Sequence, residues 1–132
     1  MTTPRSTSIT VTRPLNVLVV DDDPLILTVV DLMVRHAGHT VRTASDGVAA
    51  LDVLADAPSD VIVSDIRMPG MDGLSLARLV RKDYPAIPII LMTGYLSEFS
   101  SGSANEIGVD CILKKPFKST DLIEAIARLV PR

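Results

Sequence analysis

Three adjacent carboxylates follow an apolar segment near the start of the sequence. The segment Asn16–Val20 reads NVLVV, and Asp21, Asp22 and Asp23 come directly after it. Neighbouring like charges repel, and each carboxylate costs free energy unless it is solvated, paired or bound to a cation. Mg²⁺ prefers carboxylate and other oxygen ligands and would offset this repulsion. The cluster therefore predicts a magnesium site.

Three other residues have side chains suited to phosphoryl chemistry. They are Asp65 in SDIRMPG, Thr93 in LMTG and Lys115 in KKPF. A carboxylate can attack phosphorus and form an aspartyl phosphate. A hydroxyl and an ammonium group can hold the phosphoryl oxygens, where negative charge collects. With the acidic cluster, these residue types predict phosphoryl transfer onto Asp65.

The rest of the sequence predicts the elements that position these residues. Short segments rich in Val and Ile alternate with longer amphipathic ones, which is typical of a parallel sheet covered by helices. We expect five strands, at Asn16–Val20, Thr40–Ala44, Asp60–Ser64, Ile87–Met92 and Val109–Leu113. We expect five helices, at Pro24–Ala37, Gly47–Asp56, Gly73–Tyr84, Glu98–Ile107 and Thr120–Val130. The predicted fold class is α/β, a single doubly wound, five-stranded parallel sheet.

This architecture also predicts where the chemistry lies. In a doubly wound sheet, ligands bind beyond the carboxyl ends of the strands, where the strand order reverses. Asp21 and Asp22 follow the first predicted strand, Asp65 the third, Thr93 the fourth and Lys115 the fifth. We therefore expect these side chains to converge at one edge of the sheet.

The four motifs VVDDDP, SDIRMPGMDG, LMTG and KKPF, in this order, resemble a response-regulator receiver domain of two-component signalling. The resemblance covers about Leu15 to Val130. It implies a flavodoxin-like fold of the chemotaxis-regulator type, with strand order 2-1-3-4-5. We expect residues 15–131 to form the receiver domain and residues 1–14 to be a flexible N-terminal tail.

The resemblance also assigns roles residue by residue. Asp65 resembles the phosphoacceptor, Thr93 the switch hydroxyl and Lys115 the lysine that pairs with the phosphate. The implied ligands of Mg²⁺ are Asp22 directly, Asp21 largely through water, Asp65, and the backbone carbonyl of Arg67. By the same resemblance, the Lys115–Pro116 bond is expected to be cis, a form that is tenable because proline follows.

Two positions depart from the usual pattern of the family. Ile112, three residues before Lys115, stands where an aromatic side chain usually couples to the threonine. Isoleucine offers neither a ring edge nor a hydroxyl. Arg67 and Tyr95 occupy the positions two beyond Asp65 and Thr93, which tune the lifetime of the phosphoryl group in the family. Both side chains are large enough to restrict water near an acyl phosphate.

The function implied is that of a phosphoacceptor rather than an enzyme. A histidine kinase or a histidine phosphotransfer protein would donate a phosphoryl group to Asp65, and the domain would take part in its own phosphorylation and dephosphorylation. The output would be altered protein–protein contact through a population shift between two states. We expect a monomer or a phosphorylation-dependent dimer.

Two alternatives remain open from the sequence. A phosphatase of the haloacid-dehalogenase type would use Asp21 and Asp23 as its Asp-x-Asp pair, but it leaves Asp65 without a role and has Leu25 where Thr or Val is usual. A degenerate receiver would bind partners without being phosphorylated. Ile112 is the feature in favour of that alternative.

Composition narrows the class of protein. Hydrophobic residues make up 47% of the 132 residues, but no apolar run approaches the roughly 18 residues needed to span a bilayer. A net charge of −3 gives no basic footprint for nucleic acid. The single cysteine excludes an intramolecular disulfide framework, and the first residues lack an apolar signal segment. We expect a cytoplasmic protein without direct nucleic-acid binding or membrane insertion.

Several neighbouring residues have simpler explanations. Asp23 and Asp72 precede predicted helices and are expected to cap them, whereas strand alternation points Lys114 away from Lys115. Helix-dipole interactions account for His36 and His39 at the end of the first helix.

The first helix carries more apolar surface than one sheet face requires. Its predicted buried stripe consists of Ile26, Val29, Val30 and Met33, and Leu25, Leu27, Leu32 and Val34 extend it on both flanks. The extra surface is either buried against a neighbouring helix and the tail, or it is a docking surface for a kinase or phosphotransfer domain.

Overall fold

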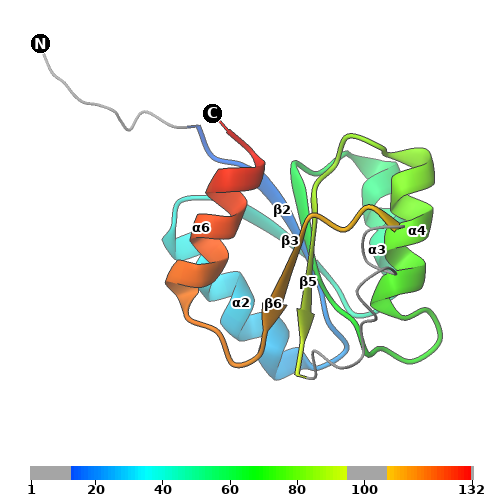
Figure 1. The fold of residues 1–132 in the computed structure, drawn as a ribbon, viewed down its shortest axis with the longest axis horizontal. Helices are drawn as coiled ribbons and strands as arrows, with labels where there is room; N and C mark the ends of the chain where they lie inside the picture. The colour runs from blue at the N-terminus through cyan, green and yellow to red at the C-terminus, as the bar shows by residue number, and fades with distance from the viewer. Residues whose placement is uncertain (1–12, 95–106, 132) are drawn as a thin grey trace, which may run out of the picture.

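A computed structural model describes residues 13–94 and 107–131, which form a parallel sheet with helices on both faces (Figure 1). The strands are β2 (Asn16–Val20), β3 (Thr40–Ala44), β4 (Val61–Asp65), β5 (Ile89–Thr93) and β6 (Cys111–Lys114). The helices in the described part are α2 (Pro24–His36), α3 (Gly47–Asp56), α4 (Gly73–Asp83) and α6 (Ser119–Leu129). The helix predicted at Glu98–Ile107 lies outside the described residues except for its last residue, as do residues 1–12 of the predicted tail.

The sheet has five parallel strands in the order β3-β2-β4-β5-β6. Counted along the chain, this is the order 2-1-3-4-5, so the predicted fold class is confirmed. The chain moves outward from β2 to β3 and then crosses back to β4 on the other side of β2. The strand order therefore reverses between β2 and β4, which is where a ligand site is expected.

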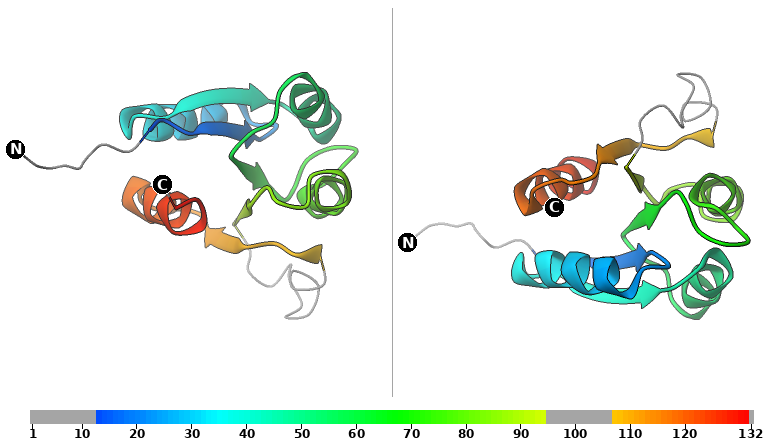
Figure 2. Two further views of the ribbon diagram at one scale, coloured as in Figure 1. Left: turned by 90° about the horizontal axis from the view of Figure 1, so that it is seen from above. Right: turned by 90° about the horizontal axis from the view of Figure 1, so that it is seen from below.

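The alternation of side chains along the strands divides the core into two layers. Leu18 and Val20 of β2 pack in one cluster with residues of α3 and α4, whereas Val17 and Val19 pack in the other with residues of α2 and α6. Figures 1 and 2 show the same arrangement, with α2 and α6 on one face of the sheet and α3 and α4 on the other. Because the sheet is covered on both faces, its strands are nearly uncharged.

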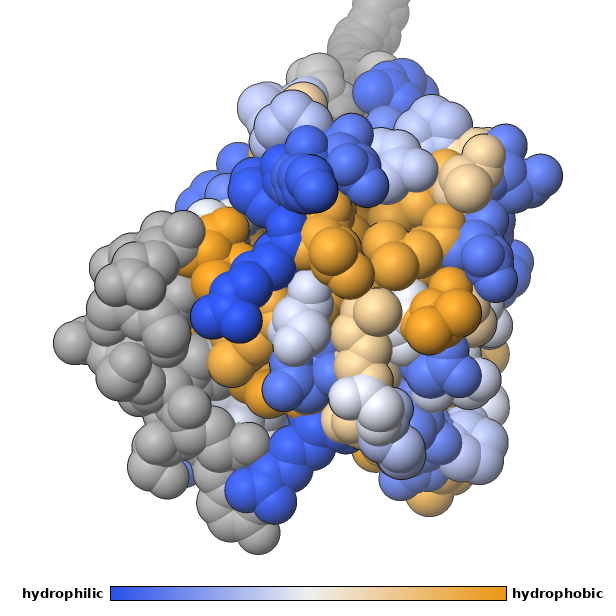
Figure 3. Space-filling view, turned by 90° about the vertical axis from the view of Figure 1, so that its right-hand side faces the viewer, coloured by the Kyte–Doolittle hydropathy of each residue, from blue (hydrophilic) through white to orange (hydrophobic). Residues whose placement is uncertain are grey.

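The layer of α3 and α4 is the outer surface seen in Figure 3, where hydrophobic side chains lie between hydrophilic ones. Val48 of α3 is 60% exposed and Leu79 of α4 is 38% exposed.

Over residues 13–94 and 107–131, none of the helices has the length and apolar character required to cross a membrane.

Aspartate side chains cap the N-termini of three of the helices. The side chains of Asp23, Asp46 and Asp72 accept hydrogen bonds from backbone N–H groups in the first turns of α2, α3 and α4. These bonds satisfy donors that a helix start otherwise leaves unpaired. The predicted capping roles of Asp23 and Asp72 are confirmed.

The buried face of α2 differs from the predicted stripe. Val30 and Val34 are buried, Ile26 and Met33 are partly buried, and Val29 is 40% exposed. The prediction that Val29 is buried was therefore wrong. Val30 and Val34 are one turn apart and face the sheet, which leaves Val29 on the side of the helix that lines a groove against α6.

Candidate functional site

The predicted site residues lie together at the carboxyl edge of the sheet. Asp21 directly follows β2, Asp65 ends β4, Thr93 ends β5 and Lys115 directly follows β6. The backbone N–H of Lys115 donates to the Thr93 carbonyl over 2.7 Å, which brings the last two strand ends into register. The expected convergence at one edge is confirmed.

Lys115 joins two carboxylates that come from different strands. Its Nζ lies 3.0 Å from Asp65 Oδ1 and 3.2 Å from Asp21 Oδ2. Asp21 is only 1% exposed, and Asp65 is also buried. The ammonium therefore partly neutralises two carboxylates that would otherwise repel each other at the base of the site.

The surroundings of Asp21 disfavour its ionised form. Burial raises the pKa of Asp21, and the nearby charge of Asp65 raises it further. The hydrogen bond that Asp21 Oδ1 accepts from the Asp23 N–H over 2.9 Å and the contact with Lys115 only partly offset this rise in the pKa. Ionised Asp21 is thus held at a cost in folding free energy.

The pKa of Lys115 is also raised, which in a lysine favours the charged form. Burial by itself lowers the pKa of Lys115, but the hydrogen bond to Asp65 and the charges of Asp21 and Asp65 outweigh burial and raise the pKa above its ordinary value. Lys115 is therefore a charged ammonium at neutral pH, as the pairing of a phosphoryl group requires.

Three carboxylates are placed to hold a metal ion. Asp21, Asp22 and Asp65 each offer an oxygen, and these oxygens lie within 4.8 Å of one another. Asp22 is exposed whereas the other two are buried, so the group opens to solvent on the Asp22 side. Hard oxygen donors and an accessible open side fit Mg²⁺, which keeps several waters when it is bound.

The remaining predicted residues surround this group. Thr93 is 1% exposed at the end of β5. Arg67 and Asp22 both line a cavity of about 570 Å³ over the loop that follows β4, beside the carboxylates. Lys114 is exposed, as predicted. The Lys115–Pro116 bond is cis, which confirms that expectation.

Three further residues singled out in the sequence, Ile112, Tyr95 and His39, have different outcomes. Ile112 lies in β6 and pairs with Leu91 in the register of the sheet. Tyr95 lies outside the described residues. His39 is buried, and its Nδ1 accepts a hydrogen bond from the Leu15 N–H over 3.1 Å. The helix-dipole explanation of His39 is therefore incomplete, because its ring ties the start of the sheet to the segment after α2.

Comparison with known protein families shows the family to which this chain belongs. A family described as the response regulator receiver domain matches residues 17–127. The chain belongs to this family. A curated relative, the DNA-binding transcriptional regulator NtrC of Escherichia coli K12, is 41% identical over 111 residues, which are 84% of this chain and 23% of NtrC. The transcriptional regulatory protein GlrR of the same organism is 36% identical over 114 residues, 86% of this chain and 26% of GlrR.

Solved structures of receiver domains have the same fold. The chemotaxis protein CheY4 of Vibrio cholerae is 34% identical with a TM-score of 0.83, covering 88% of this chain and 98% of CheY4. NtrX of Brucella abortus is 31% identical with a TM-score of 0.83, covering 89% of this chain and 27% of NtrX. The receiver domain thus matches a whole CheY4 chain but only about a quarter of NtrC, GlrR and NtrX.

Proposed function

We propose that Asp65 accepts a phosphoryl group from a histidine kinase or a histidine phosphotransfer protein, with Mg²⁺, and that phosphorylation switches protein–protein contacts. The observation that carries this proposal is the bridge from Lys115 Nζ to Asp65 and Asp21 beside the group of three carboxylates. Membership of the receiver family supports the same function, because receiver domains belong to response regulators.

The residues divide the chemistry between them. A carboxylate oxygen of Asp65 attacks phosphorus, and the bond from phosphorus to the nitrogen of the donor breaks. Lys115 and Thr93 donate to the phosphoryl oxygens as charge is transferred to them. Asp21, Asp22, Asp65 and the Arg67 carbonyl would hold Mg²⁺, which when bound offsets the negative charge of the phosphoryl group.

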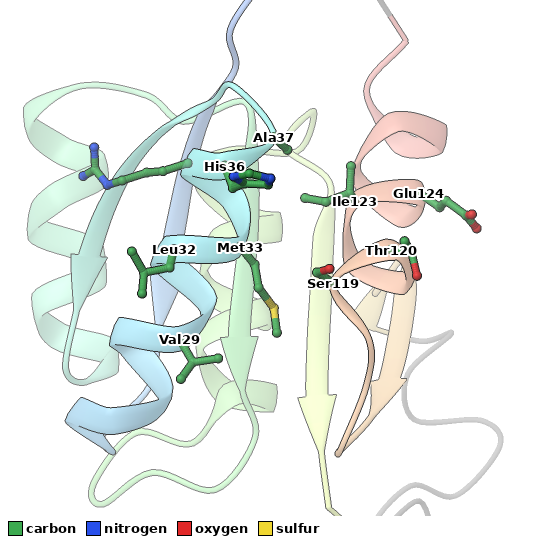
Figure 4. Close-up of a pocket in the computed structure, with 10 residues that line it drawn as sticks. Val29, Leu32, Met33, His36, Ala37, Ser119, Thr120, Ile123 and Glu124 are labelled. Carbon is green, nitrogen blue, oxygen red and sulfur yellow. The ribbon is translucent and has the colours of Figure 1, made fainter.

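A groove between α2 and α6 supports docking of the phosphodonor. It has a volume of about 910 Å³, and Met33 and Ile123 point into it from the two helices (Figure 4). A second cavity of about 390 Å³ shares Val29 and Met33 with the groove and is lined also by Lys115. The groove therefore adjoins a cavity that is lined by Lys115.

The exposure of α2 supports docking over the alternative of broader burial. Leu25 is 68% exposed and Leu32 is 63% exposed within the described part of the chain. Apolar side chains clustered along one helix beside a groove are typical of a surface that another protein covers.

The competing phosphatase hypothesis finds less support in the geometry. It requires Asp21 and Asp23 to act together, but Asp23 is exposed and its Oδ1 accepts the Leu25 N–H over 2.9 Å as the cap of α2. Asp65, which that hypothesis leaves unused, contacts Lys115. We therefore infer a signalling domain rather than an enzyme. The predictions of a cytoplasmic location, of no direct nucleic-acid binding by this domain, and of a monomer or phosphorylation-dependent dimer stay predictions.

Phosphorylation by a small donor tests the proposal. The protein is incubated with Mg²⁺ and acetyl phosphate, and its intact mass is measured for the wild type, Asp65→Asn and Asp21→Asn. We expect one phosphoryl adduct on the wild type, none on Asp65→Asn, and a slower or weaker adduct on Asp21→Asn. A receiver of established activity controls for the donor.

Two other outcomes would overturn the proposal. An adduct that survives Asp65→Asn and disappears in Asp21→Asn would favour the phosphatase. The absence of any adduct, with an active donor in the control, would favour a degenerate receiver.

A further inference from the structure

Arg81, in the last turn of α4, joins three separate segments of the chain. Its Nη1 donates to the carbonyls of Pro85 and Ile87 over 2.6 and 3.1 Å. Its Nη2 donates to the Gly108 carbonyl over 2.6 Å and to Asp110 Oδ2 over 3.0 Å. The guanidinium therefore ties the end of α4 to the segment that enters β5 and to the segment that enters β6.

Asp110 extends this connection into the sheet. Its Oδ2 accepts the Ile89 N–H over 2.8 Å, and its own N–H donates to the Ile89 carbonyl over 3.0 Å. Ile89 is the first residue of β5, and Asp110 immediately precedes β6. The start of β6 is thus held against the start of β5 by one backbone–backbone bond, from the Asp110 N–H to the Ile89 carbonyl, and by the Asp110 carboxylate, which accepts the Ile89 N–H and which Arg81 orients.

Gly108 shows how closely Arg81 approaches this segment. The backbone of Gly108 has a φ of +87°, and a Cβ at this position would lie 3.0 Å from Arg81 Nε. A residue with a side chain would therefore be strained and would also crowd the guanidinium. Glycine at this position therefore leaves room for the Arg81 side chain beside the turn into β6.

The register of β6 matters because the strand is short and is followed by two adjacent lysines. β6 has four residues, lies at the edge of the sheet and pairs with β5 alone. Lys114 is exposed, and Lys115 reaches Asp65 and Asp21. Successive residues of a strand point to opposite faces, so a slip of one residue would exchange the two lysines. A short edge strand has few contacts of its own with which to resist such a slip.

We propose that Arg81 is a positioning residue for Lys115: with Asp110, it fixes the start of β6 against β5 and thereby directs Lys115, and not Lys114, toward Asp65. The inference rests on the proposed phosphorylation of Asp65. The opposite end of the strand is fixed by the bond from the Lys115 N–H to the Thr93 carbonyl. Arg81 supplies the matching restraint at the start of the strand.

The test uses a matched pair of arginine variants. Arg42, on β3, donates to the backbone carbonyls of Val53 and Ala57 and to the Ser59 hydroxyl, and none of these three partners belongs to β5 or β6. Arg42→Met therefore loses three guanidinium hydrogen bonds and Arg81→Met four, in different places. For both variants and the wild type, the rate of phosphorylation by acetyl phosphate at saturating Mg²⁺, the affinity for Mg²⁺ and the exchange of the Lys115 amide proton are measured.

We expect Arg81→Met to be phosphorylated roughly fivefold to tenfold more slowly than the wild type, because a small displacement of a group that binds the reacting phosphoryl is costly. The Lys115 amide should exchange faster in this variant, whereas Mg²⁺ affinity should change little. Arg42→Met should keep the wild-type rate and the wild-type protection of Lys115. Equal slowing in both arginine variants would mean a general loss of stability and would overturn the inference.

Asp110→Asn keeps the test decisive if Arg81→Met does not fold. The amide oxygen can still accept from the Ile89 N–H, but the charge that holds Arg81 is lost. We expect a smaller slowing in the same direction, and a wild-type rate in Asp110→Asn would then overturn the inference. A wild-type protein that accepts no phosphoryl group refutes the proposed function instead, so the two failures are distinguishable.

Discussion

Asp21 bears an electrostatic cost in the site, because burial penalises its charged form. It is buried, it faces Asp65, and its cationic neighbour Lys115 is shared with that second carboxylate. Burial is the first cause of its raised pKa. A residue kept in this state is expected to serve function at the expense of stability.

We therefore expect Asp21→Asn to stabilise the protein in the absence of divalent cations at pH 7, by an amount on the order of 1 kcal/mol. Asparagine fills nearly the same volume without the charge that burial penalises. Urea unfolding of both proteins in EDTA measures the difference. Asp52→Asn, at an exposed position on α3, is a control for the loss of one negative charge elsewhere. A destabilised Asp21→Asn would show that the ion pair with Lys115 outweighs burial.

The same comparison has a defined pH dependence. Because the folded pKa of Asp21 is raised above the unfolded value, the unfolded chain loses this proton first as the pH rises. In that window the folded state binds more protons, so the contribution of Asp21 to stability falls with rising pH. We expect the advantage of Asp21→Asn to be small below the ordinary aspartate pKa of 3.8 and to grow above it. A difference that shrinks with rising pH would contradict this assignment.

At the scale of elements, the junction between β4 and α4 places the phosphoacceptor. The Gly73 N–H donates to the Ile66 carbonyl over 2.7 Å, so the start of α4 folds back onto the end of β4. A Cβ on Gly73 would collide with the Asp65 carbonyl oxygen and would lie 2.9 Å from Ile66 Cα. Only glycine permits this approach of helix to strand.

Gly73→Ala should therefore destabilise the protein by about 1–3 kcal/mol, as overpacking does, and should also slow phosphorylation of Asp65. Thermal unfolding and the acetyl phosphate assay measure the two effects. Asp72→Ala is the matched control, because it removes the cap of α4, the bond to the Ser75 N–H, without touching Asp65. If the two variants slow phosphorylation equally, the effect comes from α4 and not from displacement of Asp65.

The strands could be predicted from their Val- and Ile-rich segments, with the first two starting as predicted at Asn16 and Thr40, but the starts of the last three could not. The fourth strand begins at Ile89 and not at Ile87, because Pro88 has no N–H to donate to a ladder. The fifth begins at Cys111 and not at Val109, because Asp110 binds Ile89 with its side chain and backbone. No local sequence pattern indicated the role of Arg81, because its bond to Asp110 joins residues 29 apart in sequence.

At the scale of the whole molecule, the site could be predicted because parallel strands bring their carboxyl ends to one edge. The residue types at those ends and the order of the motifs were enough to assemble Asp21, Asp65, Thr93 and Lys115. Distances and burial were not predictable in this way. The adjacent residues Asp21 and Asp22 show this, because Asp21 is buried whereas Asp22 is exposed, and nothing in the motif VVDDDP distinguishes their burial.

Because the clustered carboxylates destabilise the folded chain, binding of Mg²⁺ to them is expected to stabilise it. Mg²⁺ would bind oxygens that converge only in the folded chain, so it stabilises the folded state by mass action. Folding would gain about 2.7 kcal/mol when free Mg²⁺ reaches roughly 100 times its dissociation constant. Urea unfolding at increasing Mg²⁺ and constant ionic strength measures the gain. Asp22→Asn should remove most of the response, because the exposed Asp22 is the proposed direct ligand, whereas Asp23→Asn should retain it because Asp23 caps α2. Equal responses in these two variants would place the cation elsewhere on the surface and would separate the acidic cluster from the proposed phosphorylation.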